Sequence, residues 1–198
     1  MTKKRQPITA AELMAKLQND PEFLAQQKER ERIRNEKTAA RRETEKPLLA
    51  ELRELGYVLE TVWDLVNTAT PYPIAIPVLL KHLPKPYPDR VREGIARALA
   101  VPVAKEEWDT LISEYIKAKC ENERGTKDGL AVAISAISDD TRINDLLGLI
   151  RDRQHGECRV LLLRGLKKSK LPEAKQALKE LENDPDLEKE IKSWRRSK

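Results

Sequence analysis

The sequence is poor in several residue types that particular folds and chemistries require. Its 198 residues include seven glycines, two histidines and two cysteines, and aromatic residues make up 4%. A sandwich or barrel needs alternating runs rich in β-branched and aromatic residues, and no such run persists here. No apolar stretch approaches the roughly 20 residues that a membrane span needs. These absences predict an all-α chain that does not cross a membrane.

The two cysteines show no pattern of a metal or disulfide framework. Cys120 and Cys158 stand far apart, without a CxxC pair or a nearby set of histidine ligands. This arrangement favours two reduced thiols in a cytoplasmic protein. The N-terminal stretch MTKKRQPITAAEL has no apolar core of a secretory signal, which also favours the cytoplasm.

The charge is abundant but unevenly placed. Charged residues make up 36% of the chain, and the net charge is +5. Residues 1–46 contain 12 Lys and Arg against 8 Asp and Glu, and residues 167–198 contain 10 against 7. Residues 47–166 contain 16 against 18. The basic character therefore lies at the two ends, whereas an array dedicated to DNA would carry it along the body.

The N-terminal residues predict two helices. Thr9 and Glu12 have the spacing of a capping box, which predicts a helix from about Ala10 to Gln18. Asp20 can then cap a second helix that begins at Pro21. This second helix has few apolar positions as far as residue 46, so it is either a solvated charged helix or an interaction arm for an acidic partner or RNA.

Beyond residue 46 the composition changes to amphipathic segments. PLLAELRELG ends at Gly56, a good helix terminator, and a second amphipathic helix is expected from Tyr57 to Val66. Its expected apolar face is formed by Val58, Leu59, Val62, Trp63 and Val66.

Two helix registers recur with a shared period. The first helices align with offsets of 32, 35 and 31 residues, and the second helices with offsets of 35 and 32. The first helices contain the segments that begin at Pro77, Asp109, Asn144 and Lys175, and the second helices those that begin at Val91, Thr126 and Cys158. In each first-helix segment the third, fourth and seventh positions are apolar. A single helical hairpin cannot bury its apolar face alone, so a period of this kind predicts stacked hairpins.

One copy resembles the HEAT repeat. In PDRVREGIARALA, residues 88–100, the positions that carry the resemblance are Asp89, Val91, Arg92, Ala96, Ala98 and Leu99. The chain is similar to small bacterial HEAT-repeat proteins, which implies a right-handed α-solenoid of about four to five hairpins after a charged N-terminal extension, residues 1–46. The repeat domain, residues 47–198, would comprise repeats at about 47–70, 73–101, 104–137, 141–168 and 171–196. In this family the cation at Arg92 usually serves packing between repeats; Lys127 and Arg159 keep that cation.

Catalytic and metal-binding patterns are weak. His82 and His155 lie in different repeats; His82 is expected to be a partly exposed helix-end residue and His155 a turn residue. Asp139 and Asp140 precede a first helix, where capping is a better explanation than a metal site. Trp108 is expected in the core, although HEAT-like DNA glycosylases use aromatic residues in their groove. No cofactor, metal or catalytic residue is therefore assigned.

The remaining candidate surface is the exposed side of the second helices. Its mixed charge fits protein recognition better than nucleic acid, because carboxylates repel phosphates. The candidate partner-binding residues are Arg90, Glu93, Arg97, Lys127, Asp128, Arg159 and Arg164. We expect a monomeric, non-catalytic scaffold that binds another protein, with an inhibitor or immunity protein as one form. Nucleic-acid binding through the basic ends, residues 28–46 and 167–198, is the alternative, and a glycosylase or lyase is the least supported.

Overall fold

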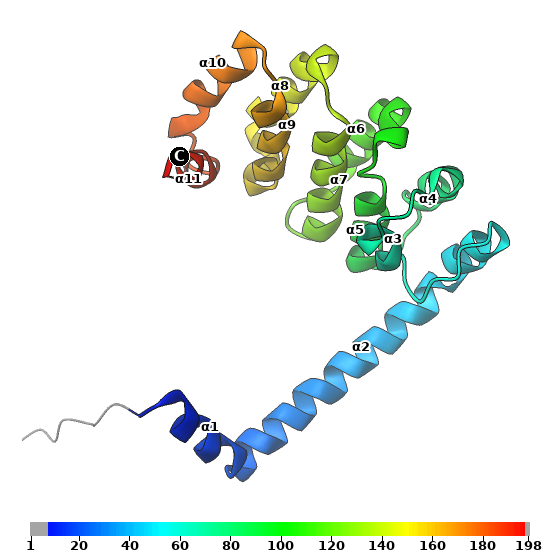
Figure 1. Cartoon of the computed structure of the whole chain (residues 1–198), viewed down its shortest axis with the longest axis vertical. Coiled ribbons are helices and arrows are strands. Elements are labelled where there is room, and N and C mark those ends of the chain that lie inside the picture. Colours follow the sequence, from blue (N-terminus) through cyan, green and yellow to red (C-terminus); the bar gives the residue numbers. More distant parts are fainter. Residues whose placement is uncertain (1–7, 197–198) are drawn as a thin grey trace, which may run out of the picture. The chain divides into compact units, whose positions relative to one another are not determined.

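The computed structural model describes residues 8–196, apart from the side chains of Ala15, Arg195 and Arg196 (Figure 1). Within these residues the chain forms helices and no strand, which confirms the predicted all-α class. No helix in this part of the chain is both long and apolar enough to cross a membrane. The chain divides into two compact units, one up to Glu43 and one from Thr44 onward.

The first unit contains α1 (Ala10–Gln18) and most of α2 (Pro21–Glu54). The predicted capping box at the start of α1 is confirmed: the Glu12 amide donates to the Thr9 hydroxyl at 3.3 Å, and the Thr9 amide donates to the Glu12 carboxylate at 3.0 Å. Asp20 accepts hydrogen bonds from amides in the first turn of α2, as its position predicts. Local capping therefore sets both helix starts.

The part of α2 in the first unit is held by charge pairs along its own surface. Arg32 lies 2.7 Å from a Glu29 oxygen and 2.5 Å from a Glu36 oxygen, which are its neighbours one turn away. No residue between 22 and 44 is buried. This agrees with a solvated charged helix, and its use as an interaction arm stays a prediction.

The expected helix Tyr57–Val66 is wrong in its first half. The structure has a short helix, α3 (Trp63–Asn67), preceded by a turn. The Asp64 carboxylate accepts a hydrogen bond of 2.8 Å from the Glu60 amide, so side-chain capping replaces a helical turn. Val58 is 83% exposed instead of lying on the apolar face.

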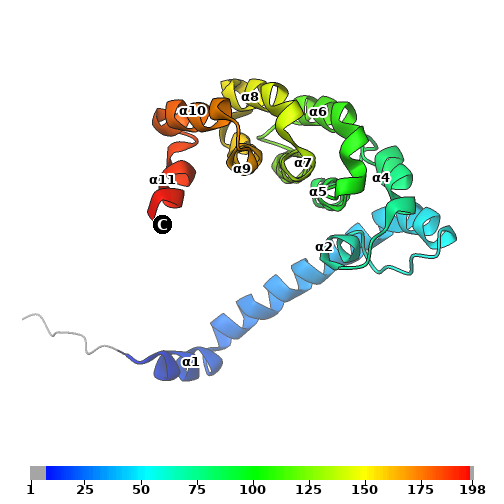
Figure 2. The ribbon, with the colours of Figure 1, turned by 45° about the horizontal axis from the view of Figure 1, so that its top comes forward.

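The remaining helices of the second unit form two rows, as Figure 2 shows. The first row contains α4 (Ile76–His82), α6 (Trp108–Lys117), α8 (Ile143–Arg151) and α10 (Pro172–Glu180), and the second row contains α5 (Asp89–Ala98), α7 (Arg124–Ile137), α9 (Leu163–Lys168) and α11 (Glu188–Arg196). Short 3₁₀ helices lie between them: η1 (Pro73–Ala75), η2 (Pro102–Glu107), η3 (Asp140–Arg142), η4 (Arg153–Leu162) and η5 (Leu181–Asn183). The second row lies on the inner side of the curve that the two rows follow.

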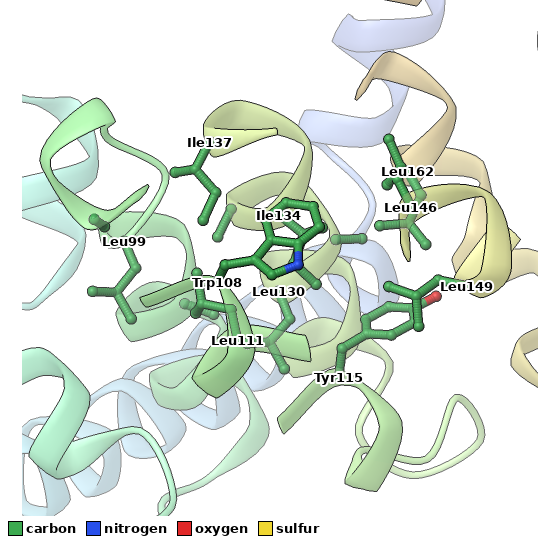
Figure 3. Close-up of a cluster of buried hydrophobic side chains, with 14 of the residues drawn as sticks. Leu99, Trp108, Leu111, Tyr115, Leu130, Ile134, Ile137, Leu146, Leu149 and Leu162 are labelled. Carbon is green, nitrogen blue, oxygen red and sulfur yellow. The ribbon is translucent and has the colours of Figure 1, made fainter. Parts of the chain in front are cut away.

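The apolar repeat positions form the core between the rows. The third and seventh positions of every aligned first helix are buried: Leu79, Leu83, Leu111, Tyr115, Leu146, Ile150, Ala177 and Leu181. Figure 3 shows Trp108 within this cluster, beside Leu130 and Ile134 of α7. Trp108 is 1% exposed, so its predicted core position is confirmed. Burying a large apolar side chain of this kind contributes about 1.5–3 kcal/mol.

The backbone contact between α5 and α7 requires a glycine at residue 129. A Cβ atom at Gly129 of α7 would lie 2.8 Å from the Glu93 carbonyl oxygen of α5, a distance that backbone atoms cannot relieve without moving a helix. Of all pairs of elements in this unit, α5 and α7 make the most extensive contact with each other. The absence of a side chain at Gly129 therefore permits the close approach of α5 and α7.

Candidate partner-binding face

The seven candidate residues do not form one exposed surface. Arg90 and Arg164 are exposed, and Arg97 and Asp128 are half-buried. The other three candidates, Glu93, Lys127 and Arg159, are buried. We therefore call the exposed sides of α5, α7, η4 and α9 the inner face, and describe the exposed and buried residues separately.

On α5, an ordered cluster of charges surrounds Trp63. The Arg90 guanidinium lies 3.6 Å from the centre of the Trp63 ring, whose Nε1 donates to the Arg90 carbonyl. Arg90 donates to one oxygen of Glu93 at 2.7 Å, and Arg97 Nε donates to the other at 2.8 Å. One carboxylate thus orients two arginines on the inner face.

Asp128 extends this charged surface from α5 onto α7. Burial raises the pKa of its carboxyl, while the positive charges of Arg124 and Arg97 act in the opposite direction. Arg124 lies 3.7 Å from Asp128 and also donates to Glu157 of η4 at 3.2 Å. We call this network of mixed charge, which runs across α5, α7 and η4, the charged strip.

The expected exposure of Lys127 and Arg159 is wrong, because both cations hold the helix pairs together. Arg92, Lys127 and Arg159 each donate to a backbone carbonyl nine residues earlier, at the C-terminal end of the preceding first helix. The helix dipole places negative partial charge there, so a cation is favoured. We call these three residues the aligned cations, and the contacts that each makes the first, middle and last junction.

The first and last junctions also contain acids from the following helix pair. Arg92 contacts Glu123 and lies 3.5 Å from Glu114. Arg159 contacts both oxygens of Asp184, at 3.0 and 3.1 Å, and one oxygen of Asp186 at 2.6 Å. Burial opposes ionisation of Asp184, but hydrogen bonds from Arg159 outweigh it and lower the pKa of this carboxyl.

The middle junction has an imidazole where the others have carboxylates. Lys127 Nζ lies 3.1 Å from His155 Nδ1 and donates to the Ala118 carbonyl at 2.7 Å. Burial lowers the pKa of both Lys127 and His155, and the neighbouring lysine charge lowers that of the histidine further. The Tyr115 ring contacts both side chains, and its buried hydroxyl has no hydrogen-bond partner in the part of the chain that the structure describes.

A disulfide lies at this same junction, so the expectation of two reduced thiols is wrong for this structure. Cys120 follows α6 and Cys158 lies in η4, and their sulfur atoms are bonded, with Cα atoms 6.3 Å apart. Cys158 is fully buried, whereas Cys120 is partly exposed. The distance between the two cysteines along the chain concealed a pairing that the stacking of helix pairs creates.

His82 is also buried, contrary to the expected partly exposed helix end. Its Nε2 lies 3.1 Å from Glu51 of α2, and its Nδ1 lies 2.6 Å from the Tyr87 hydroxyl. Hydrogen bonds from Lys81 and His82 lower the pKa of Glu51 to about 2. Burial lowers the pKa of His82 itself. These contacts attach the end of α2 to α4 and are structural.

Of the acidic pair before α8, Asp139 caps the short 3₁₀ helix η3, whereas α8 itself begins after Arg142 without a side-chain cap. Asp139 accepts hydrogen bonds from the Thr141 amide at 2.9 Å and from its hydroxyl at 2.5 Å, and lies 2.5 Å from Lys105. These contacts lower its pKa strongly, with the Lys105 hydrogen bond as the largest cause. Residues 8–196 contain no group of three acidic, histidine or cysteine side chains that could hold a metal ion.

An apolar groove of about 680 Å³ lies at one end of the inner face. Its sides come from α3, the loop of residues 68–73, residues 100–103 after α5, and α7. Leu65, Val66, Val101, Val103 and Val132 supply apolar surface, and Arg97 is the charged residue among those that line the groove. The groove thus joins the charged strip of α5 through Arg97.

Sequence reasoning missed the groove, the junction at His155 and the disulfide. The groove combines segments of several helix pairs, and no local motif marks it. The burial of Lys127 and Arg159 did have a signal, because both align with Arg92, a position at which the resemblance to HEAT repeats implies packing. Comparison with known proteins finds no matching family model, no matching curated protein and no matching solved structure.

Proposed function

We propose that this chain is a non-catalytic scaffold that binds another protein through its inner face, within a HEAT-like right-handed α-solenoid. The observation that carries the proposal is the cluster of Trp63, Arg90, Glu93 and Arg97. An exposed arginine stacked on a tryptophan and fixed by a buried carboxylate loses little side-chain freedom on binding. Arginine and tryptophan are also the residue types enriched at the energetic centres of protein interfaces.

The arrangement of the helices supports this proposal. The shared period of the sequence and the two rows of helices both agree with stacked HEAT-like repeats, which commonly bind partners along the inner row. The mixed charges of Arg124, Asp128 and Glu157 extend the surface toward Arg164 of α9. Arg164 is exposed. A surface of both signs favours a protein partner of complementary charge.

The experiment is a binding assay on the full chain. The wild-type protein captures partners from its native cell, and each partner identified by mass spectrometry is then purified and titrated by calorimetry. Arg90→Glu and Arg164→Glu change the inner face, and Lys117→Glu on α6 is the matched control in the other row. We expect each inner-face change to weaken binding about tenfold, equal to about 1.4 kcal/mol. Equal affinity of all three variants for every partner contradicts the proposal.

Nucleic-acid binding through the basic ends is the second candidate, and several of its cations are already engaged. Lys168 donates to three carbonyls at the end of α7, and Lys167 lies 4.3 Å from the Trp194 ring. Residues 197–198, at the end of the second basic segment, lie outside the described residues. Titration of RNA and DNA between about 50 and 200 mM salt tests this function, because phosphate contacts weaken steeply with salt.

A cytoplasmic location remains part of the proposal, as does a monomeric state. Disulfides are rare in the reducing cytoplasm. The oxidation state of the Cys120–Cys158 pair in resting cells therefore tests the cytoplasmic location. Alkylation of free thiols in acid-quenched cells, followed by mass spectrometry, measures this. A complete disulfide in resting cells contradicts the cytoplasmic location.

A further inference from the structure

The groove is preformed by contacts that do not need a ligand. The Tyr72 hydroxyl donates to the Ala98 carbonyl at 2.9 Å, and this buried hydrogen bond attaches the loop of residues 68–73 to the end of α5. Tyr72 itself is 6% exposed and lines the groove. A site that is already shaped loses less conformational entropy when a ligand binds.

The groove exposes apolar surface that the fold leaves uncovered. Val103 is 54% exposed at one side of the groove, and Val132 of α7 is half-buried on another. With Val66 of α3, they present apolar surface from three separate segments. Cavities of this volume, apolar with a few polar groups, are typical of ligand sites.

Arg97 supplies an oriented positive charge at this apolar surface. Its Nε donates to buried Glu93, which fixes the plane of the guanidinium. Its two terminal nitrogens donate to no other group within residues 8–196. The Glu93 carboxylate is shared with Arg90, so this triad of side chains has one positive charge in excess, and the Asp128 carboxylate of α7 offsets part of it. A planar pair of free N–H donors suits a carboxylate.

We propose that this groove binds a peptide segment of a partner protein that presents apolar side chains and one Asp or Glu carboxylate to Arg97. The inference rests on the proposed function and adds the chemistry of the segment that is recognised. The apolar side chains lie against Val103 and Val132, and the carboxylate accepts hydrogen bonds from the terminal nitrogens of Arg97. The charge of the groove selects the acidic residue, and its apolar surface selects the neighbouring side chains.

The test is a selection of random 12-residue peptides displayed on phage against the full-length protein. Enriched peptides are synthesised, and their affinities are measured by fluorescence anisotropy. We expect the enriched peptides to share one acidic residue beside apolar ones. Replacement of that acidic residue by its amide, or Arg97→Gln in the protein, lowers affinity about tenfold. Val103→Asp, at an exposed position that the fold tolerates, lowers it by a similar factor.

Two matched controls separate groove binding from general effects. Ile116→Asp changes an apolar side chain on α6 that is 56% exposed, close to the exposure of Val103, and Arg164→Gln removes an exposed cation outside the groove. Both are expected to keep affinity within about twofold of wild type. A thermal unfolding curve for each variant verifies that it is folded.

The remaining outcomes overturn the inference. It fails if no peptide is enriched, if enriched peptides lack an acidic residue, or if they bind the Val103→Asp and Ile116→Asp variants equally. It also fails if decanoate, a free carboxylic acid, occupies the groove and no peptide competes with it. The proposed function is tested separately with the captured partner protein. If Arg164→Glu no longer binds that partner while Val103→Asp binds it fully, the partner uses the inner face and does not use the groove.

Discussion

The middle and last junctions connect neighbouring helix pairs in the same way, through a buried cation, but the partners of the two cations differ. In both, a buried cation donates to the carbonyl end of a first-row helix and reaches the following helix pair. Arg159 meets two aspartates, whereas Lys127 meets a neutral imidazole and a nearby disulfide supplies the connection. Ion pairing therefore holds the last junction, and a covalent bond holds the middle one. The difference predicts that the two junctions respond to different perturbations.

The largest expected effect comes from breaking the ion pairs of the last junction. Arg159→Met leaves buried Asp184 with only the exposed Arg153, 3.5 Å away, as a cation, and the loss of one partner of a buried pair typically costs about 3–5 kcal/mol. Urea unfolding followed by circular dichroism measures this loss. Asp186→Asn is the milder control, since its side chain is 34% exposed and Asp184 still neutralises the arginine. A loss below about 1 kcal/mol for Arg159→Met contradicts the role of the last junction.

Breaking the disulfide should have the next largest effect. Cys120→Ser removes a bond that closes a loop of 38 residues, and bonds of this kind contribute about 2–4 kcal/mol. Reduction of the wild-type protein by a dithiol should lower the urea midpoint to that of Cys120→Ser. The variant itself should not respond to the dithiol, and this serves as the control. An unchanged midpoint in reduced wild-type protein contradicts the role of the disulfide in holding the middle junction.

Acidification should weaken the middle junction before the last one. Burial lowers the pKa of His155 in the folded chain, so the unfolded chain binds this proton first as the pH falls below about 6.5. Stability therefore decreases in that range. Asp184 has a lowered folded pKa, and its contribution is lost only at lower pH, when the carboxyl becomes protonated. Unfolding midpoints measured from pH 7.5 to about 3 should reveal both losses.

A comparison of variants at the two histidines shows which of them causes the loss of stability near neutral pH. Burial lowers the pKa of His82 in the same direction, so it contributes to the same decrease. The charges around His155 are Lys127, Asp152 and Arg159. His155→Gln should remove one part of the decrease near neutral pH, and His82→Gln should remove the other. If His155→Gln leaves the pH profile unchanged, the lysine–imidazole contact does not set the acid response.

The smallest expected effect is removal of the middle cation. Lys127→Met relieves the burial of a charge but leaves the Ala118 carbonyl without its donor, so the two changes offset each other. We expect a change of about 1 kcal/mol or less in the free energy of unfolding while the disulfide is intact. In the reduced protein the same substitution should cost more. An effect as large as that of Arg159→Met removes the distinction between the junctions.

Local signals in the sequence predicted the local features well. The Thr9–Glu12 capping box, the Asp139 cap and the core position of Trp108 all depend on near neighbours or on helical periodicity. The helix expected from Tyr57 was wrong because the Asp64 side chain captures backbone amides that a helix would use. That competition is also local, but periodicity alone does not weigh it.

The candidate face depended on contacts between distant residues. Lys127 and Arg159 occupy the register of Arg92, and this alignment indicates packing rather than exposure. The partners that bury them, such as Asp184 and His155, lie 25 and 28 residues further along the chain. No sequence motif marks the groove, because its lining comes from α3, a loop, and two second-row helices.

The sequence by itself determined the all-helical class, the shared period and the apolar positions of each first helix. These follow from the periodicity of side chains along a helix, which acts over a few residues. The tertiary structure alone decided which side chains the buried cations contact, that Cys120 meets Cys158, and that Arg97 lines an apolar groove. These features arise when neighbouring helix pairs stack, because stacking brings together side chains whose separation along the chain no local rule fixes.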